Sequence, residues 1–135
     1  MTPHDLALRF LAKARQDEIV IDKLMDDGEI SDEALGFHYQ QAVEKLLKAV
    51  LAERDVEVPK THNLIYLMDA LGDAGCSVPE ALEALAVLNP FAVVLRYDLI
   101  GDDPSLRLDR QQMRSLVREL RTWTETKVLS PNETG

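Results

Sequence analysis

The clearest pattern in the chain is a run of apolar positions at helical spacing between residues 31 and 54. They recur at i, i+4, i+7 and i+8, as follows: Leu35, Tyr39, Ala42, Val43, Leu46, Leu47, Val50 and Leu51. This spacing predicts an amphipathic helix that begins near Ser31, a good N-cap residue, and ends near Arg54. The remaining positions are too polar and too varied to be explained by packing: His38, Gln41, Glu44, Lys45 and Lys48. We therefore treat this polar side as a candidate functional surface.

Helices are also predicted at both ends of the chain. The first covers about residues 3–25, with Thr2 as its N-cap, and Gly28 is expected to end it in a left-handed conformation. The last runs from about Asp109 to Val128 and turns an apolar face inward. Both segments are long enough to span a small helical domain.

Two shorter apolar segments lie between the long ones. One covers residues 61–71 and starts at Thr61 or Asn63. The other covers residues 79–94 and contains Pro90, which predicts either a kink or a restart capped by the preceding asparagine. This second segment is apolar on nearly every side, which is more than one small domain can bury. We therefore expect a homodimer across this region.

No segment alternates apolar and polar residues as a half-buried strand would. The chain has 135 residues, 46% of them hydrophobic and only 5% aromatic, which favours helix packing in a single domain. The predicted fold class is therefore all-α, an antiparallel four- to five-helix up-and-down bundle. We expect this domain to cover residues 1–128 and a disordered tail to cover residues 129–135.

Composition narrows the classes of function. The net charge of −9 disfavours non-specific nucleic-acid binding. Cys76 is the single cysteine, which indicates a reduced, cytoplasmic setting and a small half-buried residue at this position. No signal peptide or membrane-spanning run is visible. The three histidines are not spaced as metal ligands and no phosphate-binding P-loop is present, so we expect no metal and no cofactor.

Arginines gather in the last predicted helix and just before it. They are spaced 3, 4, 4 and 3 apart, along one flank of the helix: Arg107, Arg110, Arg114, Arg118 and Arg121. Because a guanidinium binds phosphate through a planar fork, this is a candidate phosphate- or partner-binding stripe. The alternative, to which we give more weight, is that the arginines pair with acidic residues of the same or a neighbouring helix.

Four segments together resemble the HEPN family of small helical bundles. They are, in the order expected for that family, residues 8–14 followed by Asp17, Phe37–Ala49, Thr61-His62-Asn63-Leu64, and Arg96-Tyr97 after an apolar helix. The resemblance extends over roughly residues 5 to 125. It implies an all-α bundle that dimerises, and it implies one of two functions.

The resemblance implies either a metal-independent ribonuclease or a partner of a minimal nucleotidyltransferase, often encoded as a toxin–antitoxin pair. The ribonucleases carry an arginine followed, after four to six residues, by a histidine that transfers protons while the arginine stabilises phosphate charge. This sequence has no such pair: Arg54 and His62 are separated by seven residues that include Pro59. Arg96 is followed by aspartates and by no histidine.

The first hypothesis is therefore a non-catalytic, dimeric HEPN protein that binds a nucleotidyltransferase, with a nucleotide or RNA as a further candidate ligand. The residues we assign to binding are His38, Gln41, Lys45, Lys48, His62, Arg96 and Tyr97. A structural alternative is that they form internal hydrogen bonds between helices. The rival functions are a ribonuclease with a degenerate site, using His62 or His38 as base and Arg96 or Lys45 for phosphate, and a nucleic-acid binder using the arginine stripe.

Overall fold

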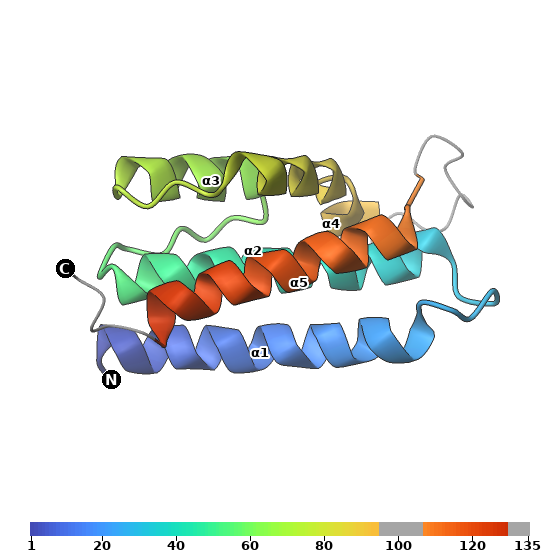
Figure 1. The fold of residues 1–135 in the computed structure, drawn as a ribbon, viewed down its shortest axis with the longest axis horizontal. Coiled ribbons are helices and arrows are strands. Elements are labelled where there is room, and N and C mark those ends of the chain that lie inside the picture. The colour runs from blue at the N-terminus through green and yellow to red at the C-terminus, as the bar shows by residue number, and fades with distance from the viewer. Residues whose placement is uncertain (95–106, 130–135) are drawn as a thin grey trace.

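The computed structural model describes residues 1–94 and 107–129, which are helical with short connections and contain no strand. The elements in chain order are α1 (Pro3–Leu24), α2 (Asp32–Glu53), α3 (Leu64–Asp73), the 3-10 helix η1 (Glu80–Leu88), α4 (Phe91–Val94) and α5 (Arg110–Val128). Figure 1 shows them in sequence colours. The prediction of an all-α bundle is confirmed. In the described residues no helix is both long and apolar enough to cross a membrane.

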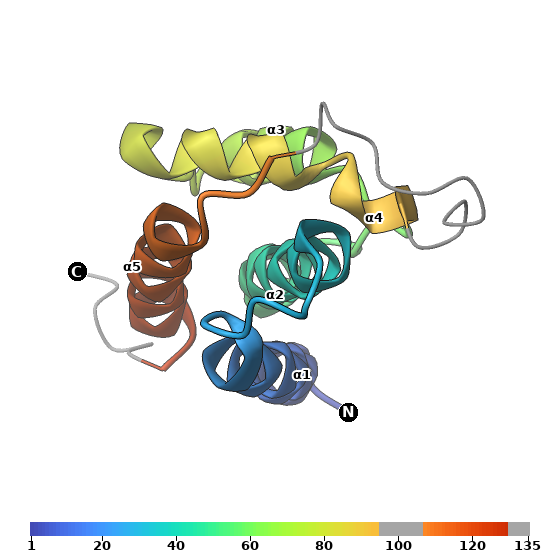
Figure 2. The ribbon, with the colours of Figure 1, turned by 90° about the vertical axis from the view of Figure 1, so that its right-hand side faces the viewer.

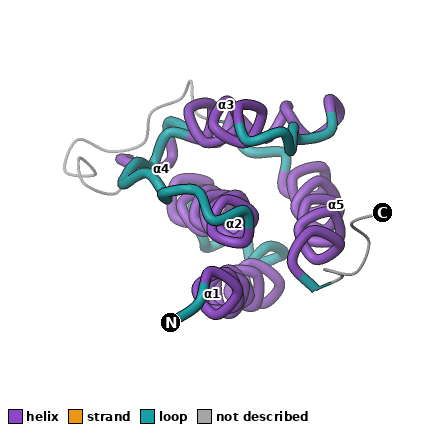
Figure 3. Tube along the Cα trace, turned by 90° about the vertical axis from the view of Figure 1, so that its left-hand side faces the viewer, coloured by secondary structure: helices purple, strands orange, loops and turns teal. Residues whose placement is uncertain are grey.

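The three long helices lie side by side, and α2 is at the centre. α1 and α2 run in opposite directions, and α5 runs alongside them in the same direction as α2 (Figure 1). Seen along the bundle, α3 and η1 form a second layer across α2 and α5, and α4 packs at one end of that layer (Figures 2 and 3). This arrangement leaves the side of α2 opposite α5 without a covering helix among the described elements.

Most helix starts follow from local capping chemistry. Thr2 and Asp5 form a reciprocal capping box at α1, and the Ser31 hydroxyl accepts the Ala34 N–H at α2. Asn63 and Asp109 cap α3 and α5 in the same way. The predicted start of each of these four helices is therefore confirmed, with Asn63 and not Thr61 opening α3.

The predicted left-handed glycine at the end of α1 is wrong. Gly28 does not have a positive φ, and Asp27 instead closes the turn by accepting the Glu29 N–H on its side chain at 2.9 Å. Such a side-chain turn needs no left-handed residue. The left-handed glycine of the described chain is Gly75, which follows α3 with a φ of 77°.

The fourth segment is interrupted at Pro90 and restarts as the α-helical turn α4, which is one of the two predicted alternatives. Its first part differs from the prediction, since it is a 3-10 helix and not an α-helix. With three residues per turn, its buried leucines share one face: Leu82, Leu85 and Leu88. Its opposite side is open, and Val87 is 63% exposed. The exposure of Val87 agrees with the expectation that one domain cannot bury every apolar residue of this segment. The homodimer inferred from that expectation stays a prediction.

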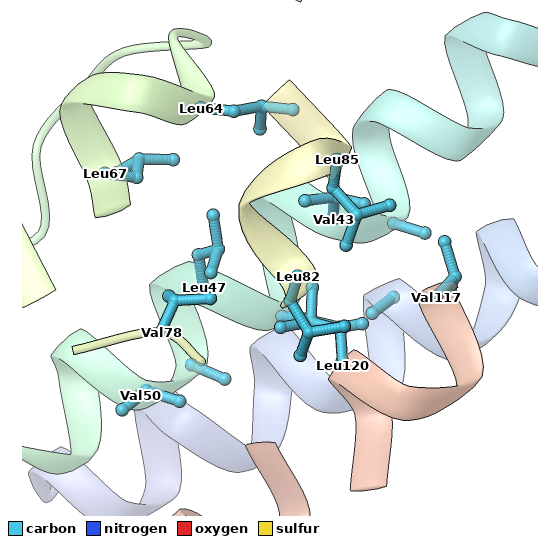
Figure 4. Packing of buried hydrophobic residues seen from close by; sticks show 14 of the residues in the cluster. Val43, Leu47, Val50, Leu64, Leu67, Val78, Leu82, Leu85, Val117 and Leu120 are labelled. Carbon is cyan, nitrogen blue, oxygen red and sulfur yellow. The ribbon is translucent and has the colours of Figure 1, made fainter. Parts of the chain in front are cut away.

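The core is built around α2. Val43 and Leu47 from α2 meet Leu85 from η1 and Val117 and Leu120 from α5 (Figure 4). All five side chains are fully buried. Cys76 is also buried, at 7% exposure, as a small residue of this core.

Gly36 lets α4 approach α2 closely. A Cβ added at Gly36 would lie 2.2 Å from the ring of Phe91, which is itself 2% exposed. The helix-weakening glycine in the second predicted helix therefore has a packing reason.

Several predictions lie outside the described residues. They concern the candidate site residues Arg96 and Tyr97 and the tail from residue 130 onward. Leu129, the first residue of the predicted tail, caps the C-terminus of α5.

Candidate functional site

The polar positions predicted on the second helix form two hydrogen-bonded groups, which we call the α2 polar network. Its members are Asp17, His38 and Lys45 in the first group, and Gln40, Gln41, Glu44, Lys48 and His62 in the second. The first group joins α2 to α1. The second joins α2 to the segment just before α3.

Asp17 of α1 is the centre of the first group. Its carboxylate accepts hydrogen bonds from Nδ1 of His38 at 3.1 Å and from Nζ of Lys45 at 2.6 Å. The side chains are 11%, 32% and 23% exposed for Asp17, His38 and Lys45, respectively. The carboxylate is thus inside, while parts of its two partners remain in contact with solvent.

Glu44 is the centre of the second group and is almost fully buried. It accepts hydrogen bonds from Nδ1 of His62 at 2.8 Å, from Nζ of Lys48 at 3.0 Å and from Gln40 at 3.2 Å. Burial alone would raise the pKa of Glu44, but hydrogen bonds from His62 and Lys48 outweigh it and hold the pKa below its ordinary value. Glu44 is therefore an ionised carboxylate that the hydrogen bonds from Lys48 and His62 stabilise.

One stripe of α2 remains partly exposed. Between the ends of α2, the positions that are not buried are Ala34, Phe37, His38, Gln41 and Lys45, which we call the open stripe. Tyr39 faces α5, since its hydroxyl donates to the Arg110 carbonyl at 2.8 Å. Gln41 is two residues on, roughly 200° around the helix, so the open stripe lies opposite α5.

The start of α3 lies beside His62 and has its backbone donors occupied. The Leu64 N–H donates to Asn89 Oδ1 at 2.7 Å, and the Ile65 and Tyr66 N–H groups donate to Asn63 Oδ1. Asn89 was predicted to cap a restarted fourth helix, but its side chain caps α3 instead. The adjacent cavity of about 510 Å³ is lined by Thr61, His62, Asn63, Asn89, Pro90 and Ala92. The N-terminus of α3 beside this cavity therefore offers no free amide of Leu64, Ile65 or Tyr66 to an anion.

The arginines of the predicted stripe do not share one exposed face. Arg114 is 4% exposed and binds Asp22 through Nε at 2.6 Å and Nη2 at 2.9 Å, and it also reaches Glu18. Arg121 donates to Glu18 at 2.6 Å. We call this group of two arginines and two α1 carboxylates the α1–α5 seam.

The other three arginines are placed differently. Arg110 binds Asp32 and the carbonyls of Met25, Asp27 and Ile30, so it ties α5 to the turn between α1 and α2. Arg107 and Arg118 are exposed, and Arg118 approaches Asp22 only at 3.9 Å. Arg110, Arg114 and Arg121 therefore follow the alternative prediction, in which the arginines pair with acidic residues of a neighbouring helix.

The structure joins most of the predicted site residues and adds three others. His38 and Lys45 meet at Asp17, and Lys48 and His62 meet at Glu44, which places these four in the α2 polar network. The carboxylates Asp17 and Glu44, and Gln40 beside them, were not among the predicted binding residues. Asp17 lies in a family-like segment, and Glu44 stands on the polar side of the helix, so both carried a signal in the sequence.

In the described part of the chain, no group of three or more His, Cys, Asp or Glu side chains is placed to hold a metal ion. His4, the third histidine, pairs with Glu53 at 2.6 Å and lies apart from the network. The chemistry of the site is therefore that of hydrogen bonds and ion pairs between α1, α2 and the start of α3.

Comparison with known proteins bears on the whole chain. No curated protein and no solved structure matches it. The family model of the HEPN domain matches residues 7–127, which overlap every element from α1 to α5. The match includes Asp17, the whole of α2 and His62, which are the parts that build the α2 polar network. The chain belongs to the HEPN domain family.

Proposed function

We propose that this chain is a non-catalytic HEPN protein that binds a minimal nucleotidyltransferase through the open stripe of α2 and the exposed edge of His62. A toxin–antitoxin or nucleotide-binding pair is the setting that this role implies. The family membership supports a binding bundle, and the absence of an arginine followed by a histidine at the ribonuclease spacing argues against catalysis.

One observation carries the proposal: the described lysines and histidines of the site are already paired inside the chain. Lys45 and His38 are held by Asp17, and Lys48 and His62 by Glu44. A ribonuclease of this family needs a proton-transferring histidine and a positive group on the scissile phosphate. Here the two lysines pair with buried carboxylates, and Asn63 and Asn89 occupy the amides of α3.

The same residues suit recognition of a protein surface. His38 and His62 turn Nδ1 toward a carboxylate, which leaves the other ring nitrogen for a partner. Gln41 donates to Gln40 and keeps its carbonyl oxygen for an external donor. Phe37, which meets the His38 ring edge-on at 5.5 Å, adds a half-buried aromatic surface. A polar rim beside an aromatic anchor is the composition of many protein interfaces.

The test is co-expression with the nucleotidyltransferase encoded next to this chain, recognised by a Gly-Ser…Asp-x-Asp pattern. The two proteins are expected to co-purify, and Phe37→Ser is expected to weaken the complex at least about tenfold as an interface anchor. Leu129→Ser, which removes an exposed apolar side chain at the end of α5, is the matched control and is expected to leave affinity unchanged. Equal affinity for wild type and Phe37→Ser would contradict the proposal.

A ribonuclease is the second candidate, and His62 is the observation in its favour. Its side chain is 54% exposed while Nδ1 is bonded to the buried Glu44, an arrangement that orients a histidine to act as a base. An RNA cleavage assay of wild type, His62→Ala and His38→Ala separates the two functions. We expect no cleavage by any of the three. Cleavage by the wild type that is lost in His62→Ala would replace the binding proposal with the catalytic one.

A further inference from the structure

Exposed large apolar side chains gather on the layer formed by α3 and η1. Ile65 and Tyr66 on α3 are 51% and 57% exposed, and Val87 on η1 is 63% exposed. Isolated apolar residues on a surface need no explanation, but three on two adjacent short helices form a patch. None of them belongs to the α2 polar network or to the α1–α5 seam.

Ile65 of this patch also lines a groove between α3 and η1. It encloses about 690 Å³, and its apolar lining, which we call the floor, includes Ile65, Met68 and Val78. The carboxylates Asp69, Asp73 and Glu83 also line the groove, and we call them the rim. Among the described residues, no lysine or arginine lines it. No ion pair within the described residues neutralises these three carboxylates.

The two aspartates of α3 are unfavourable for the helix that carries them. Asp69 and Asp73 stand at i and i+4, where like charges repel each other. Asp73 is also the last residue of α3, where the helix dipole already concentrates negative charge. The field of the α3 C-terminus therefore adds to that of the carboxylates, and the groove attracts positive charge more strongly than the count of aspartates alone implies.

We propose that this groove docks a segment of another protein in which apolar side chains are flanked by lysine or arginine. The apolar side chains would cover the floor, and the cations would meet the rim. α3 has 10 residues and is about 15 Å long, so the groove matches a partner segment of about ten helical residues. The rim carboxylates would repel those of a second copy and the phosphates of a nucleic acid, and the net charge of −9 adds to this repulsion. The proposed segment is therefore an alternative to the homodimer expected across residues 79–94. This inference does not depend on the proposed nucleotidyltransferase complex, since the two surfaces share no residue.

The test uses two synthetic helical peptides of about ten residues, one with leucines flanked by lysines and one with every lysine replaced by glutamate. Amide chemical shifts of the isotope-labelled chain report where each peptide binds. The lysine peptide is expected to perturb amides of α3 and η1, with an affinity that falls as salt is added. The glutamate peptide is expected to cause no shift.

Two charge-reversal variants serve as a matched pair. Asp69→Lys with Asp73→Lys is expected to weaken binding of the lysine peptide about tenfold by fluorescence anisotropy. Glu29→Lys with Glu119→Lys changes two exposed residues elsewhere and alters the net charge equally, and it is expected to leave the affinity within about twofold. The lysine at position 73 favours the helix C-terminus, so the first variant is expected to fold, which thermal unfolding checks.

Three outcomes would overturn the inference. They are shifts confined to other elements, equal loss of affinity in both charge-reversal variants, or binding of the glutamate peptide as tight as that of the lysine peptide. Sedimentation velocity of wild type and Ile65→Ser provides a separate check. A change from dimer to monomer in Ile65→Ser would assign the groove to contact between copies of this chain and would also overturn the inference.

Discussion

The α1–α5 seam and the α2 polar network use similar chemistry but differ in exposure. In the seam, Arg114 and Glu18 are 4% and 1% exposed, and the pair is closed between two long helices. In the network, Glu44 is equally buried at 6%, but its partner His62 is 54% exposed. The seam encloses both members of a charge pair, while the network encloses the carboxylate and leaves the partner at the surface.

This difference separates a structural role from a binding role. Arg114 offers its guanidinium to two carboxylates of α1 and has no surface left for a ligand. His38, Lys45 and His62 are each held at one end and reach solvent at the other. A side chain that is oriented by a buried partner and still exposed is suited to meet another molecule without losing much side-chain entropy.

The largest expected effect comes from opening the seam. Arg114→Ala leaves Asp22 and the buried Glu18 short of a cation, and we expect it to lower the free energy of unfolding by about 3 kcal/mol. The control is Arg118→Ala, which removes a 61%-exposed arginine 3.9 Å from Asp22 and should cost less than about 0.5 kcal/mol. Urea unfolding followed by circular dichroism measures both, and equal midpoints would show that the seam is not a closed structural unit.

A smaller effect is expected from the network. Glu44→Gln preserves the shape of the side chain but removes the charge that faces Lys48 and His62, and we expect a loss of about 1–2 kcal/mol in the free energy of unfolding. The loss is smaller than for Arg114→Ala because the lysine stem can carry its ammonium group to water. Glu125→Gln is the control, since Glu125 is 41% exposed and pairs with Arg121 on the same helix. A larger loss than for Arg114→Ala in the same urea titration would reverse the comparison.

The smallest expected effect is on the way the free energy of unfolding depends on pH. The hydrogen bond from Arg114 holds the pKa of Asp22 below its ordinary value in the folded protein. A carboxylate of this kind stabilises the fold above its unfolded pKa, and that contribution is lost as the pH falls through its folded pKa. Arg114→Ala should therefore lose less stability than the wild type between pH 7 and pH 3. Unfolding midpoints at several pH values measure the difference, and parallel curves would contradict it.

Local signals explain why so much of the helical structure could be predicted. Thr2, Ser31 and Asp109 accept amides only three residues ahead, so their capping role is visible in the sequence. The 3-10 conformation of Glu80–Leu88 was not predicted, because its buried leucines recur at i and i+3, a spacing that the apolar face of an α-helix also uses. Asn89 was assigned to the wrong helix, since its partner Leu64 N–H lies 25 residues away.

Part of the candidate site could also be predicted, because the spacing of polar residues along one helix is a local signal. The polar side of α2 was recognised from its spacing, but Glu44 and Lys48 on that side are buried. Amphipathic spacing describes one helix alone and does not say whether His62 and its neighbours will cover the polar side. Only the packed structure identifies Asp17 and Glu44 as the centres of the two groups.

The amino-acid sequence alone determined the helical segments, most of their starts, the resemblance to the HEPN family and the lack of the ribonuclease spacing, because all of these depend on residues close together in the chain. The tertiary structure decided which charged side chains turn inward. Arg114 meets Asp22 across 92 positions, and His62 meets Glu44 across 18. Partners this far apart are chosen by how the helices pack, and their packing depends on the whole set of apolar faces at once.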